Sequence, residues 1–286
     1  MKAIGFGFME GGSLTYRECQ GNPRPWFHRL PKTKSIVVHV GLANHGVETI
    51  INRIKAYDPK TFYDFPLNIS VAKTNSSVAS TDDQAITDYI GSLKLLKKAG
   101  VGKLITLNIS CPNTYGGEPF TTADRLDRLL SAADQVALSC PLFVKMPIDV
   151  SDKIFDELID VIIAHQVAGV TIGNLAKDRT KIKLADPLPD NIEGNLSGKP
   201  TWELSNHHIS RTYRHHKHQL TIIGVGGIFS AEDAYTKIRL GASLVELITG
   251  LIFEGPQLIG QINQGLDGLL YKDGFTHISQ AIGIDA

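Results

Sequence analysis

Short apolar runs alternate with amphipathic segments along most of this chain. The runs begin near residues 3, 66, 104, 142, 168, 221 and 244, and segments with the apolar spacing of helices follow most of them. Strands that are buried on both faces and separated by single helices pair in parallel through right-handed crossovers. The pattern therefore predicts an α/β fold, a (β/α)₈ TIM barrel of which seven of the eight strands lie in this chain.

Helices are expected over residues 46–56, 82–98, 121–138, 151–165 and 200–214, with one opened by Ser230 and a last one starting near Leu251. Residues 11–34 are rich in glycine and proline and are predicted to be loop, whereas residues 35–40 form a short extended piece. No repeat, low-complexity tract or linker divides the sequence. We therefore expect residues 1–286 to form a single domain.

Composition narrows the class of protein without indicating a function. Of the 286 residues, 42% are hydrophobic and 20% are charged, and 29 basic side chains balance 29 acidic ones. These values are typical of a soluble globular protein and argue against nucleic acid as a partner. Cys19, Cys111 and Cys140 are widely spaced and odd in number, which predicts free thiols in a reducing cytoplasm. No apolar run approaches the ~18 residues of a membrane span, and no signal peptide is recognised.

The most informative stretch is Asn108–Thr114, in which an apolar run leads into two amides, a thiol and a proline. Because the residue before a proline favours extended geometry, Cys111 is predicted at the end of a strand. Asn108 and Asn113 lie close enough in sequence to converge with the thiol on one small polar ligand, so this rim is a candidate active site. The alternative is a strand-end cysteine that packs as a small apolar side chain beside turn-forming asparagines.

Two glycine-rich strand ends indicate a phosphate site. Gly224–Ile228 ends the penultimate strand and Ile248–Gly250 ends the last one. In barrels these two loops present backbone N–H groups to an anion, although a pair of tight turns is the simpler alternative. Lys145 lies inside an apolar run and needs an anionic partner, which is either a protein carboxylate or a bound cofactor or substrate.

Histidines gather before the penultimate strand. His207, His208, His215, His216 and His218 fall in a polar helical segment with no obvious carboxylate ligands nearby in sequence. We interpret this segment as a solvated helix face, and no metal site is predicted.

Taken together, these segments resemble the dihydroorotate dehydrogenase family of FMN-dependent (β/α)₈ barrels over nearly the whole chain. The resemblance rests on Glu10–Thr15, Gly21–Pro25, Asn108–Thr114, Gly194–Pro200, Gly224–Ile228 and the Gly-Ala-Ser-Leu-Val run that starts at residue 241. It implies FMN as the cofactor and the oxidation of dihydroorotate to orotate in pyrimidine biosynthesis as the reaction.

By this resemblance, Cys111 is the general base that removes a proton while a hydride passes to the flavin. A thiol with its ordinary pKa of ~8.5 is mostly protonated at pH 7, so the site must favour the thiolate. The implied FMN contacts are Ser13, Asn68, Asn108, Lys145, Gly198, Gly226, Gly227, Thr249 and Gly250. The implied substrate contacts are Asn108, Asn113 and Asn174.

The sequence departs from the family at three places. The family's first strand has no counterpart before Met1, which agrees with the count of seven strands and predicts a shortened chain or a misplaced start. His39 stands where the family has an amide-bearing loop, and Gly173-Asn174-Leu175 lacks the family's hydroxyl side chains. These departures affect substrate contacts more than flavin contacts, so the resemblance specifies the substrate less closely than it specifies the cofactor.

The resemblance leaves the electron acceptor open among fumarate, NAD and quinone. Cysteine as the base is similar to the soluble classes, whereas Gly21–Pro25 and Phe27–Leu30 resemble the quinone class, for which peripheral membrane association is expected. A homodimer is a further expectation. The alternatives to the main hypothesis are an FMN barrel that acts on another dihydropyrimidine and a non-catalytic flavin- or phosphate-binding barrel.

Overall fold

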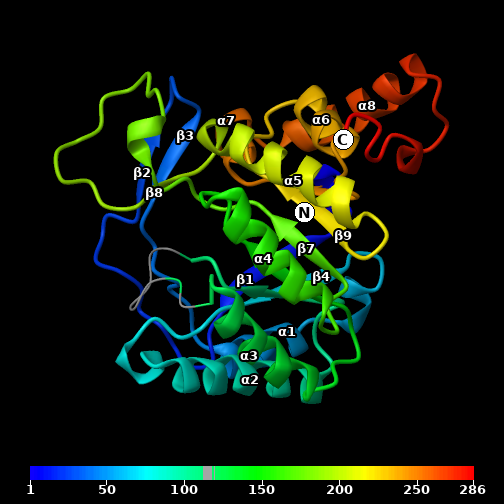
Figure 1. Cartoon of the computed structure of the whole chain (residues 1–286). Helices are drawn as coiled ribbons and strands as arrows, with labels where there is room; N and C mark the ends of the chain where they lie inside the picture. The colour runs from blue at the N-terminus through cyan, green and yellow to red at the C-terminus, as the bar shows by residue number, and fades with distance from the viewer. Residues whose placement is uncertain (112–117, 119) are drawn as a thin grey trace.

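A curled parallel sheet forms the centre of the molecule in the computed structural model, which describes residues 1–111, 118 and 120–286 (Figure 1). Its strands follow the order β1-β4-β5-β6-β7-β9-β10, and every neighbouring pair is parallel. The strands are β1 (Met9–Leu14), β4 (Leu67–Val71), β5 (Leu104–Asn108), β6 (Leu142–Met146), β7 (Gly169–Ile172), β9 (Thr221–Val225) and β10 (Leu244–Glu246). This arrangement confirms the predicted α/β barrel with seven strands.

Helices cover the outer face of this sheet, and Figure 1 shows α1 to α4 side by side around it. They are α1 (Val47–Lys55), α2 (Asp82–Ala99), α3 (Ala123–Asp134), α4 (Asp152–Ile163), α5 (Trp202–His216), α6 (Ala231–Arg239), α7 (Thr249–Glu254) and α8 (Gln257–Lys272). Short 3-10 turns occur at Lys2–Ile4, Pro59–Phe62, Ser77–Ala79, Arg179–Lys181, Lys199–Thr201 and Ile278–Gln280. The main core lies between the sheet and the helices, where side chains such as Leu93, Leu107, Leu126, Val144 and Phe155 are fully buried.

Hydroxyl side chains fix where several helices begin. Thr81 accepts a hydrogen bond from the Gln84 N–H, and the Gln84 side chain accepts one from the Thr81 N–H, so α2 opens with a capping box. Ser151 and Ser230 accept hydrogen bonds at the starts of α4 and α6 in the same way. The prediction of a helix opened by Ser230 is confirmed.

The first strand lies later in the chain than predicted. Residues Lys2–Ile4 form a 3-10 turn that ends at Gly5 with φ 104°, and the strand runs over Met9–Leu14. The glycines that indicated a loop are part of this strand, because β1 approaches β4 very closely there. A Cβ atom at Gly12 would lie 2.5 Å from the carbonyl oxygen of Ser70. The expectation that the apolar run beginning near residue 3 forms the first strand was therefore wrong.

A second, smaller sheet lies outside the barrel, at the upper left of Figure 1. It consists of β2 (Phe27–Leu30), β3 (Ser35–Val38) and β8 (Asn195–Leu196), paired antiparallel in the order β2-β3-β8. Its own core contains Leu30, Val37, Ala176 and Leu196. The extended piece near residue 35 is confirmed, whereas the prediction of loop for residues 27–30 was wrong because those residues pair with β3.

The two ends of the parallel sheet are β1 and β10, each paired with one neighbour within the part of the chain that the structure describes. The Lys2–Ile4 turn packs against α8, where the Asn263 side chain donates a hydrogen bond of 2.8 Å to the Gly5 carbonyl. Within the described ranges, no helix is long and apolar enough to cross a bilayer.

Candidate active site

A cavity of about 460 Å³ opens at the carboxyl ends of the barrel strands. This is the end at which the loops of (β/α)₈ barrels carry ligand sites, and the volume is in the range of cofactor pockets. Ten of the predicted site residues line it: Ser13, Asn108, Cys111, Lys145, Asn174, Gly198, Gly226, Gly227, Thr249 and Gly250. Residues from loops far apart in the sequence thus meet around one space.

Cys111 is half-buried and follows β5 by three residues, in agreement with the strand end that was predicted. The buried ammonium of Lys73 lies within electrostatic range of this thiol and of the Asp88 carboxylate. Burial lowers the pKa of Lys73, and attraction to Asp88 and to the Cys111 thiolate opposes that shift. By reciprocity, the Lys73 ammonium favours the thiolate form of Cys111.

A chain of polar side chains supports the floor of the cavity. The Asn108 amide donates to Ser13 Oγ at 2.8 Å, and Ser13 Oγ is 2.8 Å from Ser70 Oγ. The buried hydroxyl of Tyr89 donates to the Asn108 carbonyl at 2.8 Å. Asn68 is buried two residues before Ser70 on β4 and does not line the cavity. These bonds orient Asn108 toward the space beside Cys111.

Lys145 lines the cavity from the end of β6, and the protein supplies carboxylates near it. Glu246 on β10 interacts electrostatically with Lys145 and with Glu10 on β1. Burial, followed by repulsion from Glu10, raises the pKa of Glu246, and Lys145 counteracts the rise. Thr106 donates to the Glu10 carboxylate at 2.6 Å, whereas Glu246 Oε1 has no hydrogen-bond partner among the described residues. Glu246 is therefore a protein carboxylate near Lys145, which is one of the two partners considered for this ammonium. The cavity beside Lys145 also has space for the other, a bound anion.

Glycines line one wall of the cavity because side chains do not fit there. Gly226 has φ 109°, and a Cβ atom on it would lie 2.4 Å from Thr201 Oγ1. A Cβ atom at Gly198 would lie 2.3 Å from the Lys34 carbonyl oxygen, and one at Gly250 would lie 2.1 Å from the Ile228 carbonyl oxygen. Thr249 and Gly250 begin α7, and the first N–H groups of a helix have no acceptor within it. This wall offers backbone N–H groups to an anion, as the phosphate prediction requires.

Other predicted contacts differ in position. The Asn174 amide donates a short hydrogen bond to the Ser110 carbonyl, and its oxygen accepts from the Leu175 N–H at 2.8 Å, so this side chain is held by the backbone. His39 lies outside the residues that line the cavity, 3.0 Å from Glu193 and 3.4 Å from the Asn22 amide. Asn113 lies outside the described residues.

The small sheet, the segment that follows β3 and the residue before α5 contribute cavity residues that were not predicted. Phe27, Val40 and Leu42 give the cavity an apolar side, and Thr201 supports the glycine wall by donating to the Gly198 carbonyl at 2.8 Å. Ser197 accepts a hydrogen bond of 2.9 Å from Thr249 Oγ1. Their only signal in the sequence is proximity to the Gly-Asn-Pro and Leu-Ser-Gly segments. The three cysteines are free thiols, as predicted.

The fold is an α/β barrel, and a thiol, an ammonium and a glycine wall line one cavity at the carboxyl ends of its strands. Comparison with known proteins gives the family: the family description "Dihydroorotate dehydrogenase" matches residues 1–270. The chain is 36% identical over 286 residues to the dihydroorotate dehydrogenase (quinone) of Anaeromyxobacter dehalogenans, covering 99% of this chain and 76% of that protein. It is 34% identical over 287 residues to the protein of the same name from Trichodesmium erythraeum, covering 98% and 75%.

A solved structure agrees with the sequence comparisons. The crystal structure of DHODH from Eimeria tenella in complex with ferulenol superposes with a TM-score of 0.87 at 26% identity, covering 99% of this chain and 80% of that one. The chain belongs to the dihydroorotate dehydrogenase family. The cofactor of this family is FMN, and the glycine wall with the first N–H groups of α7 is the part of the cavity whose chemistry suits its phosphate.

Proposed function

We propose that this protein oxidises dihydroorotate to orotate in pyrimidine biosynthesis and passes the electrons to a quinone. The observation that carries the proposal is the shared cavity of Cys111, Lys145 and the Gly226–Gly227 wall. The names of the relatives support the substrate and the acceptor. Fumarate and NAD remain the alternative acceptors, and a homodimer remains a prediction.

Cys111 performs the proton transfer in this proposal. Its thiolate removes a proton from the ring carbon next to the carbonyl group, while the adjacent carbon loses a hydride, so that a carbon–carbon double bond forms in orotate. Bound FMN supplies the two-electron acceptor for that hydride. The buried ammonium of Lys73 lies within electrostatic range of Cys111 and attracts its thiolate, which supports this role.

The remaining site residues hold and orient the two ligands. The N–H groups of Gly226, Gly227, Thr249 and Gly250 would bind the FMN phosphate, and Gly198, which lines the same cavity, would contact FMN beside them. Lys145 would stabilise negative charge on the flavin ring. The remaining proposed contacts are Ser13, Asn68 and Asn108 for FMN and Asn108, Asn113 and Asn174 for the substrate.

The chain as a whole is proposed to act as one FMN-binding domain over residues 1–286. Most buried apolar side chains belong to a single core between the sheet and its helices. We propose a cytoplasmic protein that associates with the membrane surface when it delivers electrons to quinone.

Anaerobic bleaching tests this function. The purified, flavin-loaded protein should lose its flavin absorbance on addition of dihydroorotate, and Cys111→Ala should retain flavin but bleach at least ~100-fold more slowly because the base is absent. Cys140→Ala is the matched control, since this half-buried thiol lies away from the cavity. Re-oxidation by a soluble quinone, and not by fumarate or NAD, would identify the acceptor.

The same assay separates the competing functions. Bleaching by another dihydropyrimidine but not by dihydroorotate would support the related barrel enzyme. A protein that binds flavin and is bleached by neither would support a non-catalytic barrel.

A further inference from the structure

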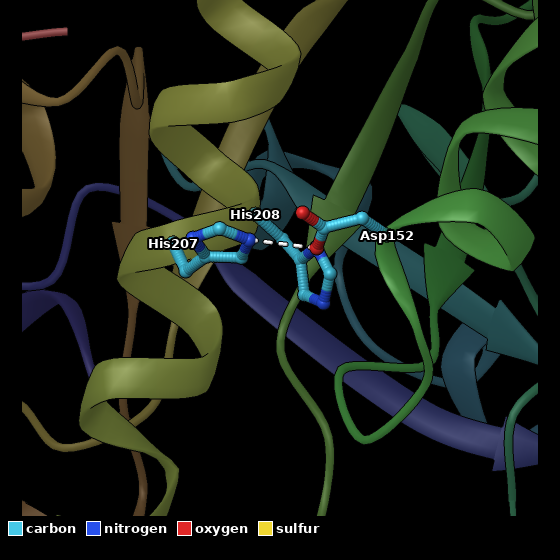
Figure 2. A group of neighbouring side chains, drawn as sticks. All are labelled: Asp152, His207 and His208. Atoms are coloured by element: carbon cyan, nitrogen blue, oxygen red, sulfur yellow. Dashed lines mark hydrogen bonds and ion pairs between the residues drawn. The ribbon is translucent and has the colours of Figure 1, made fainter.

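Three potential metal ligands converge on the outside of the barrel, away from the cavity. Asp152 is the first residue of α4, and His207 and His208 lie in α5. Figure 2 shows the two imidazole rings and the carboxylate close together between these helices. None of the three lines the cavity that holds Cys111 and Lys145. The cluster is therefore separate from the proposed active site.

His208 is buried in a way that leaves part of its ring without a partner. The residue is 2% exposed, and its ring stacks on Phe155 with centroids 3.9 Å apart and an angle of 10° between the planes. Its Nδ1 atom is buried and has no hydrogen-bond partner among the described residues. A buried polar atom without a partner costs roughly 1–3 kcal/mol, so this ring is held in place at an energetic cost that a ligand would offset.

The spacing of the three groups suits one small cation. One ligand atom from each side chain lies within 4.8 Å of the other two, and His207 Nε2 is only 2.7 Å from Asp152 Oδ1. Zinc binds imidazole nitrogen and carboxylate oxygen at ~2.0–2.2 Å, so two of its ligands are at most about 4.4 Å apart. The side chains of His207 and Asp152 are 51% and 45% exposed, which lets them close the remaining gap by small rotations. Water has access to complete the coordination shell.

The positive charge of Arg211 lowers the affinity of this cluster for a cation, but Arg211 does not occupy the space between the three ligands. Arg211 Nη1 is 3.3 Å from Asp152 Oδ2, and the same guanidinium forms a two-bond pair with Asp156. Asp156 thus offsets much of the charge of Arg211. Asp152 Oδ1 is hydrogen-bonded to His207 Nε2 at 2.7 Å, and a metal ion would replace that bond by coordinating both atoms.

We propose that Asp152, His207 and His208 bind a divalent transition-metal ion of the zinc class. Two imidazoles and one carboxylate favour such an ion over Mg²⁺ or Ca²⁺, which prefer oxygen ligands. Binding would crosslink the start of α4 to α5. Since α4 follows the strand that carries Lys145 and α5 follows Gly198, the ion would brace two supports of the cavity from outside without taking part in the chemistry.

Zn²⁺ titration of the flavin-loaded full chain tests this site. After treatment with EDTA and removal of the chelator, competition with a chromophoric zinc chelator should show one equivalent bound and a raised Tm. His207→Ala should weaken this binding at least about tenfold, as loss of a ligand-shell group does in metal sites. Asp152→Asn should act in the same direction. Both positions are exposed, so neither change should unfold the protein.

His216→Ala is the matched control because His216 is partly exposed on the same helix and lies outside the cluster. It should bind Zn²⁺ like the unmodified protein. Equal affinity in all four proteins would show that surface histidines bind the ion adventitiously and would overturn the site. Failure of the unmodified protein to bind at submillimolar Zn²⁺ would overturn it as well. Co²⁺ should give the visible absorption of a low-coordinate nitrogen and oxygen site that His207→Ala abolishes.

Discussion

Replacing Gly226 by alanine should damage the cavity wall through one identifiable contact. The new Cβ atom would lie 2.4 Å from Thr201 Oγ1, whose hydroxyl donates to the Gly198 carbonyl at 2.8 Å. Moving the threonine to relieve this overlap would disturb Gly198 as well. A single methyl group would therefore affect two of the segments proposed to hold the FMN phosphate.

The size of the effect follows from two physical costs. A non-glycine residue at φ 109° is strained by about 1–3 kcal/mol. Overpacking a tight site costs a further ~1–3 kcal/mol, because neither Thr201 nor the adjacent backbone can move freely. We expect Gly226→Ala to lower the free energy of unfolding by about 2–6 kcal/mol. If ~2 kcal/mol of this cost arises only when FMN is bound, the affinity for FMN drops about 30-fold.

Urea unfolding of the flavin-free protein and FMN titration would measure the two parts separately. Gly268→Ala is the matched control: Gly268 lies in α8, and a Cβ atom added there would have no neighbouring atom within 4 Å, so FMN affinity should not change. Thr201→Ala alone should cost about 1–2 kcal/mol, because the Gly198 carbonyl loses a hydrogen bond.

The double variant gives the decisive comparison. With the Thr201 hydroxyl removed, the nearest atoms to an alanine Cβ at position 226 are at least 3.3 Å away. The two substitutions should therefore be less damaging together than the sum of their separate effects, by about 1–2 kcal/mol. Strict additivity would refute the contact as the cause, and so would unchanged FMN binding in Gly226→Ala.

Three further outcomes are expected. Gly268→Ala should stabilise the fold by ~0.5–1 kcal/mol in urea unfolding, because alanine is the better helix former and meets no obstacle; a loss of stability would contradict the open space around it. Tyr89→Phe should cost about 1–2 kcal/mol by the same measurement, since the buried Asn108 carbonyl loses its 2.8 Å partner. Burial lowers the pKa of His208 to about 4 from 6.5, so the unfolded chain binds this proton more readily. Stability should be full above pH 6.5 and fall by about 3 kcal/mol as the pH drops to 4, and in EDTA His208→Leu should flatten that part of the profile.

Much of the barrel was predictable because its strands and helices carry local signals. The helix opened by Ser230 and the strand end before Pro112 depend on residues close together in sequence. The glycine wall was predictable for the same reason, since glycine marks the positions where backbone approaches backbone. These features placed ten of the proposed site residues around one cavity.

The parts that were missed depend on pairing between distant segments. Strand β3 pairs with β8 across more than 150 residues, and the close approach of Gly12 to Ser70 is a property of the assembled sheet. Nothing near Lys73 in the sequence indicates that its ammonium lies within electrostatic range of Cys111. His207 and Asp152 are 55 residues apart, so their contact could not be seen in the polar pattern of α5. In each case the contact joins residues far apart in the sequence, so no local pattern indicates it.

The small β2-β3-β8 sheet has a core of its own, separate from that of the barrel. A unit with a separate core can detach and reclose while the remainder of the protein stays folded. Because its residues form one side of the cavity, such excursions would govern how quickly small molecules enter and leave. Amide deuterium uptake should then be faster at Val37 and Leu196 than at Leu107 in β5, at denaturant concentrations far below the unfolding midpoint.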